Sequence, residues 1–308
     1  MAGGSALRIV DARAGGDISR VIIDGAPDLH GETVALKCED FARRHDGLRL
    51  KLIQPPHGEL HMCPVLLLPP CAPDADFGVI IMESMGYPPI SGSNLFCATA
   101  VALQHGFAAM REPETRLRVE TPAGVIAVIA RCRNGRCHSV EFENTPARIR
   151  SQTTIPDGTT GEGLALTVVS AGVDYAVVDA LGLDIRLVPE SRAALLATGE
   201  RIARHAGTDF TLFHGALEST AAGGRCRVAV FQSPAVICRS PTGTGTSALL
   251  VLLHSRGLID IDQTLTTISP GGHAFSGRIL AAHQNSNGFV LRTAISGDVV
   301  IGRELTIR

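Results

Sequence analysis

Aromatic side chains are scarce in this sequence of 308 residues, which has no tryptophan, two tyrosines and ten phenylalanines. An excess of one charge is also missing, because 28 basic residues are balanced by 30 acidic ones and the formal net charge is -2. Proteins that bind nucleic acid carry basic surfaces, and many of them stack bases on aromatic rings. We therefore expect no nucleic acid among the partners of this protein.

Long apolar runs are missing as well. The longest ones, such as residues 65–70 and 248–253, are far shorter than the roughly 20 residues that a helix needs to cross a bilayer. The first residues also lack the basic start and the apolar stretch of a secretory signal. These features predict a cytoplasmic protein with no membrane partner.

The eight cysteines lack the paired spacing of a disulfide framework. The closest pair, Cys132 and Cys137, flanks Asn134-Gly135, which favours a type I′ hairpin turn and would place the two side chains opposite each other on neighbouring strands. Because no second pair of Cys or His lies near by, we expect two free thiols here rather than zinc ligands. No other spacing in the sequence suggests a metal site.

Two apolar stretches differ from the rest of the chain, most of which consists of short β-like runs such as residues 78–82 and 174–179 separated by turn residues. Residues 91–106 and 242–257 are predicted helices. Each begins with a hydroxyl residue, a glycine and a second hydroxyl residue, and each ends with glycine. Hydroxyl side chains cap helix starts, and glycine fits the left-handed position just past a helix end.

The equal length and the shared order of features indicate that the two stretches arose by internal duplication. A helix that is apolar nearly all round must be buried. Each is therefore predicted to be the central helix of a half-barrel of strands, in an α+β fold of two pseudo-symmetric lobes. If the two helix starts open onto one cleft, their free N–H groups and positive dipole ends favour a ligand with a carboxylate.

Three segments resemble a known family, namely residues 77–83, 87–94 and 240–247. They are similar to the two active-site regions of proline racemases and hydroxyproline epimerases, and shorter matches run almost from end to end. The resemblance implies the two-lobed fold of diaminopimelate epimerase, with lobe one at 1–148 completed by about 297–308 and lobe two at 149–296. It also implies a small imino-acid substrate, no cofactor, no metal and often a homodimer.

Family racemases place one cysteine at the start of each helix, and the pair exchanges the Cα proton from opposite faces. Here Ser91 and Thr242 occupy these positions, and alcohols are far weaker acids than thiols and need an activating neighbour. Family members with threonine at the second position resemble trans-3-hydroxy-L-proline dehydratases, which need only one base. The resemblance therefore implies that Ser91 is the base and that Thr242 supports the leaving hydroxyl or shapes the pocket.

The resemblance also implies which residues surround the substrate. Ser93 stands where the family often has histidine, and Cys238 stands where it often has a substrate-binding aspartate. The backbone N–H groups at both helix starts are expected to hold the carboxylate and to stabilise the charge that builds at the transition state. The complete set of predicted substrate-binding residues is Gly92, Ser93, Asn94, Cys238, Gly243 and Thr244.

Several interpretations remain open at this point. Ser91 and Thr242 are both good N-cap residues, so capping alone could account for them. The predicted function is cofactor-free dehydration of trans-3-hydroxy-L-proline, and the alternatives are racemisation or epimerisation of proline or hydroxyproline, and binding of a small imino acid without turnover. A phosphate-binding protein is disfavoured, because no Gly-Lys-Ser/Thr string follows either glycine-rich start.

Overall fold

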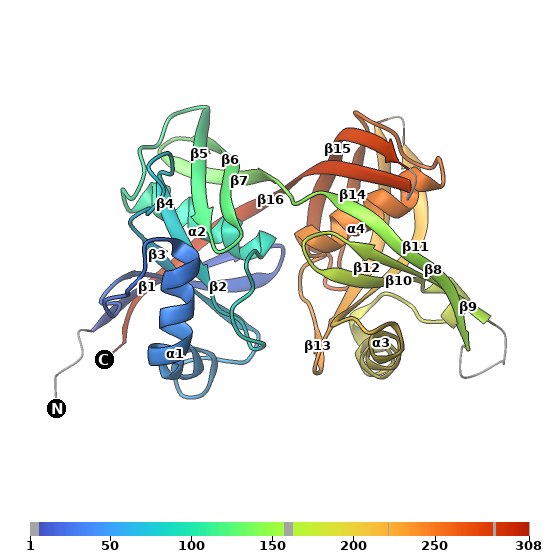
Figure 1. The fold of residues 1–308 in the computed structure, drawn as a ribbon, viewed down its shortest axis with the longest axis horizontal. Coiled ribbons are helices and arrows are strands. Elements are labelled where there is room, and N and C mark those ends of the chain that lie inside the picture. Colours follow the sequence, from blue (N-terminus) through green and yellow to red (C-terminus); the bar gives the residue numbers. More distant parts are fainter. Residues whose placement is uncertain (1–5, 157–162, 221, 286–287, 308) are drawn as a thin grey trace. The chain divides into compact units, whose positions relative to one another are not determined.

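The computed structural model describes residues 6–156, 163–220, 222–285 and 288–307. The chain divides into two units (Figure 1), and each is described by itself: unit one is Met1–Phe142 with Gly297–Arg308, and unit two is Glu143–Ser296. The described residues form sixteen strands and four α-helices. The fold is therefore the predicted sheet-dominated α+β class.

Unit one places two helices at the crossovers between parallel strands. Strands β2 and β3 are parallel and joined by α1, β4 and β5 are parallel and joined by α2, and the other neighbours are antiparallel. Parallel neighbours need a crossover connection, which is usually a helix. The elements are β1 (Leu7–Ala14), β2 (Asp17–Asp24), α1 (Val34–Ile53), β3 (Met62–Leu68), β4 (Phe77–Ile81), α2 (Gly92–Gln104), β5 (Glu114–Thr121), β6 (Gly124–Arg133) and β7 (Arg136–Glu143).

Unit two repeats this arrangement. Strands β10 and β11 are parallel and joined by α3, and β12 and β14 are parallel with α4 between them in the chain. The elements are β8 (Ala147–Pro156), β9 (Gly163–Ser170), β10 (Asp174–Asp179), the 3-10 turns η1 (Leu181–Leu183) and η2 (Pro189–Ser191), α3 (Arg192–Ala206), β11 (Phe210–Thr220), β12 (Gly223–Gln232), β13 (Val236–Ile237), α4 (Gly243–Ser255), β14 (Thr264–Ile268), β15 (Ala274–Asn285) and β16 (Gly288–Ile307). The end of β16 returns to pair with β1 of unit one.

The two units share one order of strand pairings, which confirms the pseudo-symmetry predicted from the two helices. Starting at β1 and at β9, each unit runs through antiparallel, parallel, antiparallel, parallel and antiparallel pairs. Helices α2 and α4 occupy equivalent places and are both 13 residues long. Gly106 and Gly257 follow them with φ of 76° and 68°, the left-handed conformation that favours glycine after a helix.

Helices α2 and α4 are the central helices of their units. Twelve of the 13 residues of α2 and eleven of the 13 of α4 are buried. In unit one α2 lies against β1 and β2, and in unit two α4 lies against β15 and β8. A helix that is buried on nearly all sides must be apolar nearly all round, which explains the composition of α2 and α4.

The packing around α4 predicts the effect of adding a single methyl group. A Cβ added at Gly277 on β15 would lie 2.8 Å from Thr246 Cγ2 and 3.0 Å from Leu250 Cδ1. Gly277→Ala should therefore destabilise unit two by about 1–3 kcal/mol, the usual cost of overpacking a core. Chemical denaturation measures this change. Gly215→Ala is the matched control on a strand, because its added Cβ would meet nothing closer than 3.7 Å, and equal stability of both variants would contradict the packing argument.

Helices α1 and α3 were not predicted from the sequence. The hydroxyl of Thr33 caps α1 by accepting from Leu36 N at 3.2 Å, and the helix buries Phe41 and Leu52. Helix α3 contains Gly199, and a Cβ added there would lie 2.5 Å from the Cβ of Phe231. A glycine inside a helix lowers its intrinsic propensity, but here it allows the close approach of β12.

The hairpin of β6 and β7 has the predicted geometry. Asn134 and Gly135 have φ of 55° and 67°, as a type I′ turn requires, and Cys132 pairs with Cys137 across the strands. Both thiols are free and buried.

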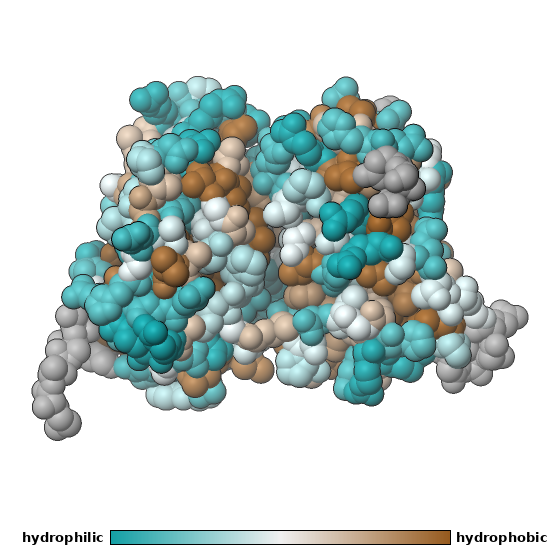
Figure 2. Space-filling model, in the orientation of Figure 1, coloured by the Kyte–Doolittle hydropathy of each residue, from teal (hydrophilic) through white to brown (hydrophobic). Residues whose placement is uncertain are grey.

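The surface carries no large continuous apolar area on the face drawn in Figure 2, where apolar residues form small groups among hydrophilic ones. Exposed large apolar side chains such as Leu181 and Val300 are far apart in the sequence. Within the described residues, no helix is long and apolar enough to cross a membrane.

Candidate active site at two helix starts

The start of α2 in unit one presents backbone donors that the helix itself does not use. The first intrahelical hydrogen bond runs from Leu95 N to Ser91 O at 2.9 Å. The amides of Gly92, Ser93 and Asn94 precede it, and the first amides of a helix have no partner within the helix. Together with the positive end of the helix dipole, they make this start suitable for an anionic group such as a carboxylate.

The hydroxyl of Ser91 does not cap α2. Its Oγ accepts no hydrogen bond from the helix amides, and it accepts instead from Asn94 Nδ2 at 2.9 Å. Ser91 lies in relaxed, extended backbone with φ of −149° and is only partly buried. Capping therefore does not account for Ser91, and its hydroxyl keeps a proton and a lone pair for other contacts.

Asn94 connects Ser91 to two residues that the sequence analysis did not single out. Its Nδ2 also donates to Glu83 Oε1 at 3.2 Å, and its Oδ1 accepts from Ser19 Oγ on β2 at 2.6 Å. The side chain is fully buried, with 1% of its surface exposed, so these bonds determine its orientation. Glu83 is the last residue of the family-like segment 77–83, and this place in the segment is the only sign of its role in the sequence. Ser19 lies about 70 residues before α2, so no local pattern connects the two.

Thr242 at the start of α4 has a different role from Ser91, because its hydroxyl caps the helix. Thr242 Oγ1 accepts from Gly245 N at 3.0 Å, while the amides of Gly243 and Thr244 precede the first intrahelical bond, from Thr246 N to Thr242 O. The backbone of Thr242 is strained, with φ of 59°. Such a conformation persists in a β-branched residue only where surrounding bonds fix it, and Ser240 Oγ accepts from Thr242 N at 3.2 Å.

Tyr175 on β10 links two hydroxyls at the start of α4. Its Oη lies 3.2 Å from Thr242 Oγ1 and 2.7 Å from Thr244 Oγ1, and the ring is 1% exposed. The two units are alike in this respect. Ser19 on β2 places its hydroxyl against Asn94 at the start of α2, and Tyr175 on β10 places its hydroxyl against the start of α4. In the sequence, Tyr175 stands out only as one residue of the β-like run 174–179.

The cap of α4 yields a stability prediction. Thr242→Ala removes the acceptor for Gly245 N and the partner of Tyr175, and loss of an N-cap typically costs about 1–2 kcal/mol. We expect the free energy of unfolding to fall by that amount in chemical denaturation. Thr242→Ser keeps the capping oxygen and should stay within about 0.5 kcal/mol of the unchanged protein. Equal loss in both variants would show that the oxygen does not stabilise the helix start.

Two cysteines near the helix starts differ in environment. Cys97 on α2 is a fully buried core residue, and burial raises the pKa of its thiol to about 12. Cys238 precedes α4 and is partly exposed, and its Sγ donates to Gln232 Oε1 at 3.6 Å.

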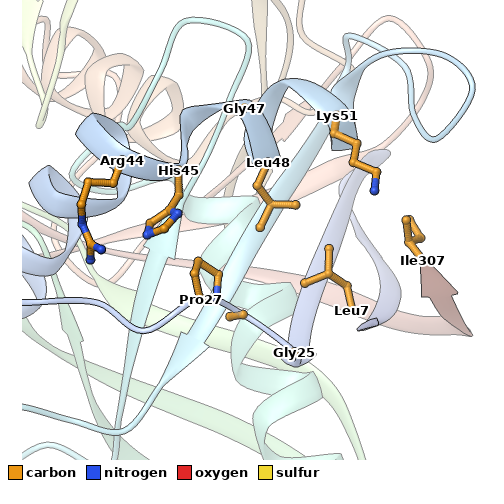
Figure 3. Close-up of a pocket in the computed structure, with 10 residues that line it drawn as sticks. Leu7, Gly25, Pro27, Arg44, His45, Gly47, Leu48, Lys51 and Ile307 are labelled. Atoms are coloured by element: carbon orange, nitrogen blue, oxygen red, sulfur yellow. The ribbon is translucent and has the colours of Figure 1, made fainter. Parts of the chain in front are cut away.

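No group of three or more His, Cys, Asp or Glu side chains in the described ranges is arranged to hold a metal ion. A cavity of about 640 Å³ lies elsewhere in unit one, where Arg44, Leu48 and Lys51 of α1 line it together with Leu7 and Ile307 (Figure 3). None of the predicted site residues lines this cavity.

Comparison with known proteins identifies the family. The sequence profile of the family described as proline racemase matches residues 9–307. The chain belongs to the proline racemase family. Among relatives of this family, the 4-hydroxyproline 2-epimerase of Rhizobium etli is 31% identical over 282 residues, which cover 87% of this chain and 82% of the relative.

Solved structures of the proline racemase family have the same fold. A hydroxyproline epimerase from Agrobacterium vitis, with bound trans-4-hydroxy-L-proline, has a TM-score of 0.87 at 26% identity and covers 100% of this chain and 94% of its own. A probable proline racemase from Agrobacterium radiobacter K84, with bound carbonate, has a TM-score of 0.84 at 28% identity, with 98% and 93% covered. These similarities confirm the fold predicted from the family resemblance.

Proposed function

We propose that this member of the proline racemase family acts at the Cα of a hydroxyproline and dehydrates trans-3-hydroxy-L-proline. Family membership and the relatives named for hydroxyproline support the substrate class. We favour dehydration because the hydroxyls at the two helix starts differ in their hydrogen bonds. Ser91 is not engaged in capping, whereas Thr242 caps its helix in a strained backbone. A two-base racemase needs groups on both faces of Cα that can each accept and return a proton, whereas a dehydratase needs only one base.

Ser91 is proposed as the base that removes the Cα proton. An alcohol needs help to carry negative charge, and two features support charge on its Oγ: the hydrogen bond from Asn94 Nδ2 at 2.9 Å and the positive end of α2. Asn94 is in turn held by Glu83 and Ser19. The remaining amides at the two helix starts are proposed to hold the substrate carboxylate and to stabilise the enediolate-like charge on it.

Thr242 is proposed to serve the leaving group. Its Oγ1 already accepts from Gly245 N, which makes it a poor base, but its hydroxyl proton can still be donated. In the proposed reaction the Cα proton passes to Ser91, the bond between C3 and its hydroxyl breaks, and Thr242 supplies the proton with which that hydroxyl leaves as water. The enamine product then tautomerises to the cyclic imine. Ser91, which reacts as its alkoxide, releases the proton from Cα to solvent, and Thr242 takes up one proton from solvent, so both side chains regain their starting states.

Incubation in deuterated water tests this proposal. The protein is mixed separately with trans-3-hydroxy-L-proline, trans-4-hydroxy-L-proline and L-proline, and NMR follows Cα exchange, inversion and pyrroline formation. Pyrroline from the 3-hydroxy isomer is the expected result. Ligand binding without exchange or product would favour the non-catalytic binder and overturn the enzyme proposal.

Epimerisation is the second candidate, and it rests on the relatives that are named as hydroxyproline epimerases. It predicts Cα exchange with inversion of trans-4-hydroxy-L-proline and no loss of water. For this outcome Thr242 would have to act as a second base despite its bond to Gly245 N.

A further inference from the structure

We propose that Tyr175 is a positioning residue that turns Thr242 into a hydrogen-bond donor. This inference rests on the proposed dehydration. A threonine hydroxyl has one proton and two lone pairs. One lone pair of Thr242 Oγ1 accepts from Gly245 N, and Tyr175 Oη lies within hydrogen-bond distance at 3.2 Å. When Tyr175 donates to the second lone pair, the proton of Thr242 is directed away from the protein contacts.

Thr244 favours this direction of the hydrogen bonds. Its Oγ1 lies 2.7 Å from Tyr175 Oη, the shorter of the two contacts of that phenol. If Thr244 donates to Tyr175, the single proton of Tyr175 is left for Thr242, and the three hydroxyls form one chain that ends in a free donor. Tyr175 is 1% exposed and Thr244 is 8% exposed, so little water competes with these bonds, and hydrogen bonds in such a site are comparatively strong.

The burial of Tyr175 keeps the phenol in place. Its ring packs against Phe210 with centroids 5.1 Å apart. Phenylalanine at position 175 would keep this packing and remove only the hydroxyl. The substitution Tyr175→Phe therefore removes the contacts of this hydroxyl with Thr242 and Thr244 and leaves the ring packing in place.

Comparing two rates in one experiment tests this role. In Tyr175→Phe we expect pyrroline formation to fall by about 10- to 100-fold, which is less than the roughly 10²–10⁴-fold of a lost general acid because Thr242 itself remains. Cα exchange in deuterated water should stay within about twofold and KM within about threefold. Thr211→Val is the matched control, because it removes another buried hydroxyl of unit two, which donates to Gly199 O of α3 at 2.9 Å. It should leave both rates unchanged.

Three outcomes would overturn the inference. A parallel loss of exchange and elimination would indicate a merely structural role. Unchanged or faster elimination would mean that Tyr175 accepts from Thr242 rather than donating to it. Failure of the unsubstituted protein to release water would instead overturn the proposed function itself, and the donor role with it.

A second and independent observation concerns the hairpin of β6 and β7. Cys132 and Cys137 are directly opposite each other, and the N–H of Cys132 points away from β7, because it donates to Pro113 O at 2.9 Å. The two cysteines therefore form a non-hydrogen-bonded pair, in which Cα atoms are typically about 4.5 Å apart. That separation lies within the range of about 4.4–6.8 Å in which disulfides form.

We infer that Cys132 and Cys137 are a site of disulfide formation by small oxidants. Both side chains are buried, 3% and 5% exposed, and Thr115 Oγ1 lies 3.6 Å from Cys132 Sγ. Burial raises the pKa of the Cys137 thiol to about 12, and the neighbouring Cys132 adds to this shift. With diamide as oxidant, the two thiols lose two electrons and two protons to become the disulfide, and the azo bond of the reagent takes them up to become the hydrazine.

Peptide mapping of the intact folded protein tests this site. After treatment with diamide, trypsin cuts behind Arg133 and Arg136, so the fragments that carry Cys132 and Cys137 stay joined only through a disulfide. We expect the joined fragment in the unsubstituted protein and its loss in Cys132→Ser. Because burial suppresses the thiolate, the cross-link should form faster at pH 9 than at pH 7. Separate fragments with free thiols at both pH values would overturn the inference.

Discussion

Ser91→Ala is expected to lower kcat for the dehydration of trans-3-hydroxy-L-proline by at least about 10³-fold, because the substitution removes the proposed base. The side chain accepts from Asn94 Nδ2 and takes no part in capping α2. The helix start should therefore keep its backbone geometry, and substrate binding through the amides should persist. Pyrroline formation measures kcat, and circular dichroism confirms that the variant is folded.

Two further variants make this result specific to the hydroxyl. Ser91→Cys places a more acidic group at the same helix start, where thiolates are favoured, and it should keep activity. Ser84→Ala removes another partly buried serine seven residues earlier in the chain and should leave turnover unchanged. Full activity in Ser91→Ala would remove Ser91 from its proposed role.

Glu120→Gln is expected to destabilise unit one by about 2–4 kcal/mol, because it weakens several charge-assisted bonds at once. The carboxylate on β5 is 5% exposed and accepts from three backbone amides: Val34 N at 3.1 Å, and Cys71 N and Ala72 N at 2.7 Å each. It thereby ties the start of α1 to the loop after β3. A glutamine side chain has only one acceptor oxygen, so at least one of these buried amides loses its partner.

The same carboxylate makes stability depend on pH. Burial alone would raise the pKa of Glu120, but the three backbone donors outweigh it, and the net shift is downward. A carboxyl with a lowered pKa in the folded state contributes stability that is fully present above its unfolded pKa of about 4.3 and is lost as the pH falls through the folded value. Denaturation between pH 7 and pH 3 should show this loss in the unsubstituted protein and a flatter profile in Glu120→Gln.

Glu114→Gln is the control on the same strand. Glu114 forms ion pairs with the exposed arginines Arg116 and Arg131, and such surface pairs contribute about 0–1 kcal/mol. A loss in Glu114→Gln as large as that in Glu120→Gln would show that charge on the strand, rather than the buried amides, causes the effect.

Local rules predicted the elements whose determinants lie within a few neighbouring residues. The cap of α4, the glycines that follow α2 and α4, and the Asn134-Gly135 turn are such cases and appear as expected, whereas the expected cap of α2 by Ser91 is not formed. Helices α1 and α3 escaped prediction because each contains a glycine, Gly47 and Gly199, and Gly199 is explained only by its contact with Phe231 on a distant strand.

The sequence predicted that Ser91 and Thr242 stand at the starts of two helices, but it did not predict the hydrogen bonds that their hydroxyls form. Motif matching located Ser91 and Thr242, because both stand at the same place in a duplicated pattern. As sequence, the two residues are equally good caps. Their hydrogen bonds differ because Asn94, which accepts from Ser19 and donates to Glu83, holds Ser91, whereas Tyr175 and Gly245 hold Thr242.

By itself, the sequence determined the family, the two buried helices and the hydroxyl that begins each of them, since these depend on residue type, spacing and length. Only the tertiary structure decided that Ser91 does not cap its helix and that Thr242 has a strained backbone. The reason is physical. A hydroxyl can turn to several partners. Thr242 meets Tyr175 on β10, and Ser91 meets Asn94, whose side chain is held by Ser19 on β2. Only folding brings these two strands, which are distant in the chain, to the helix starts.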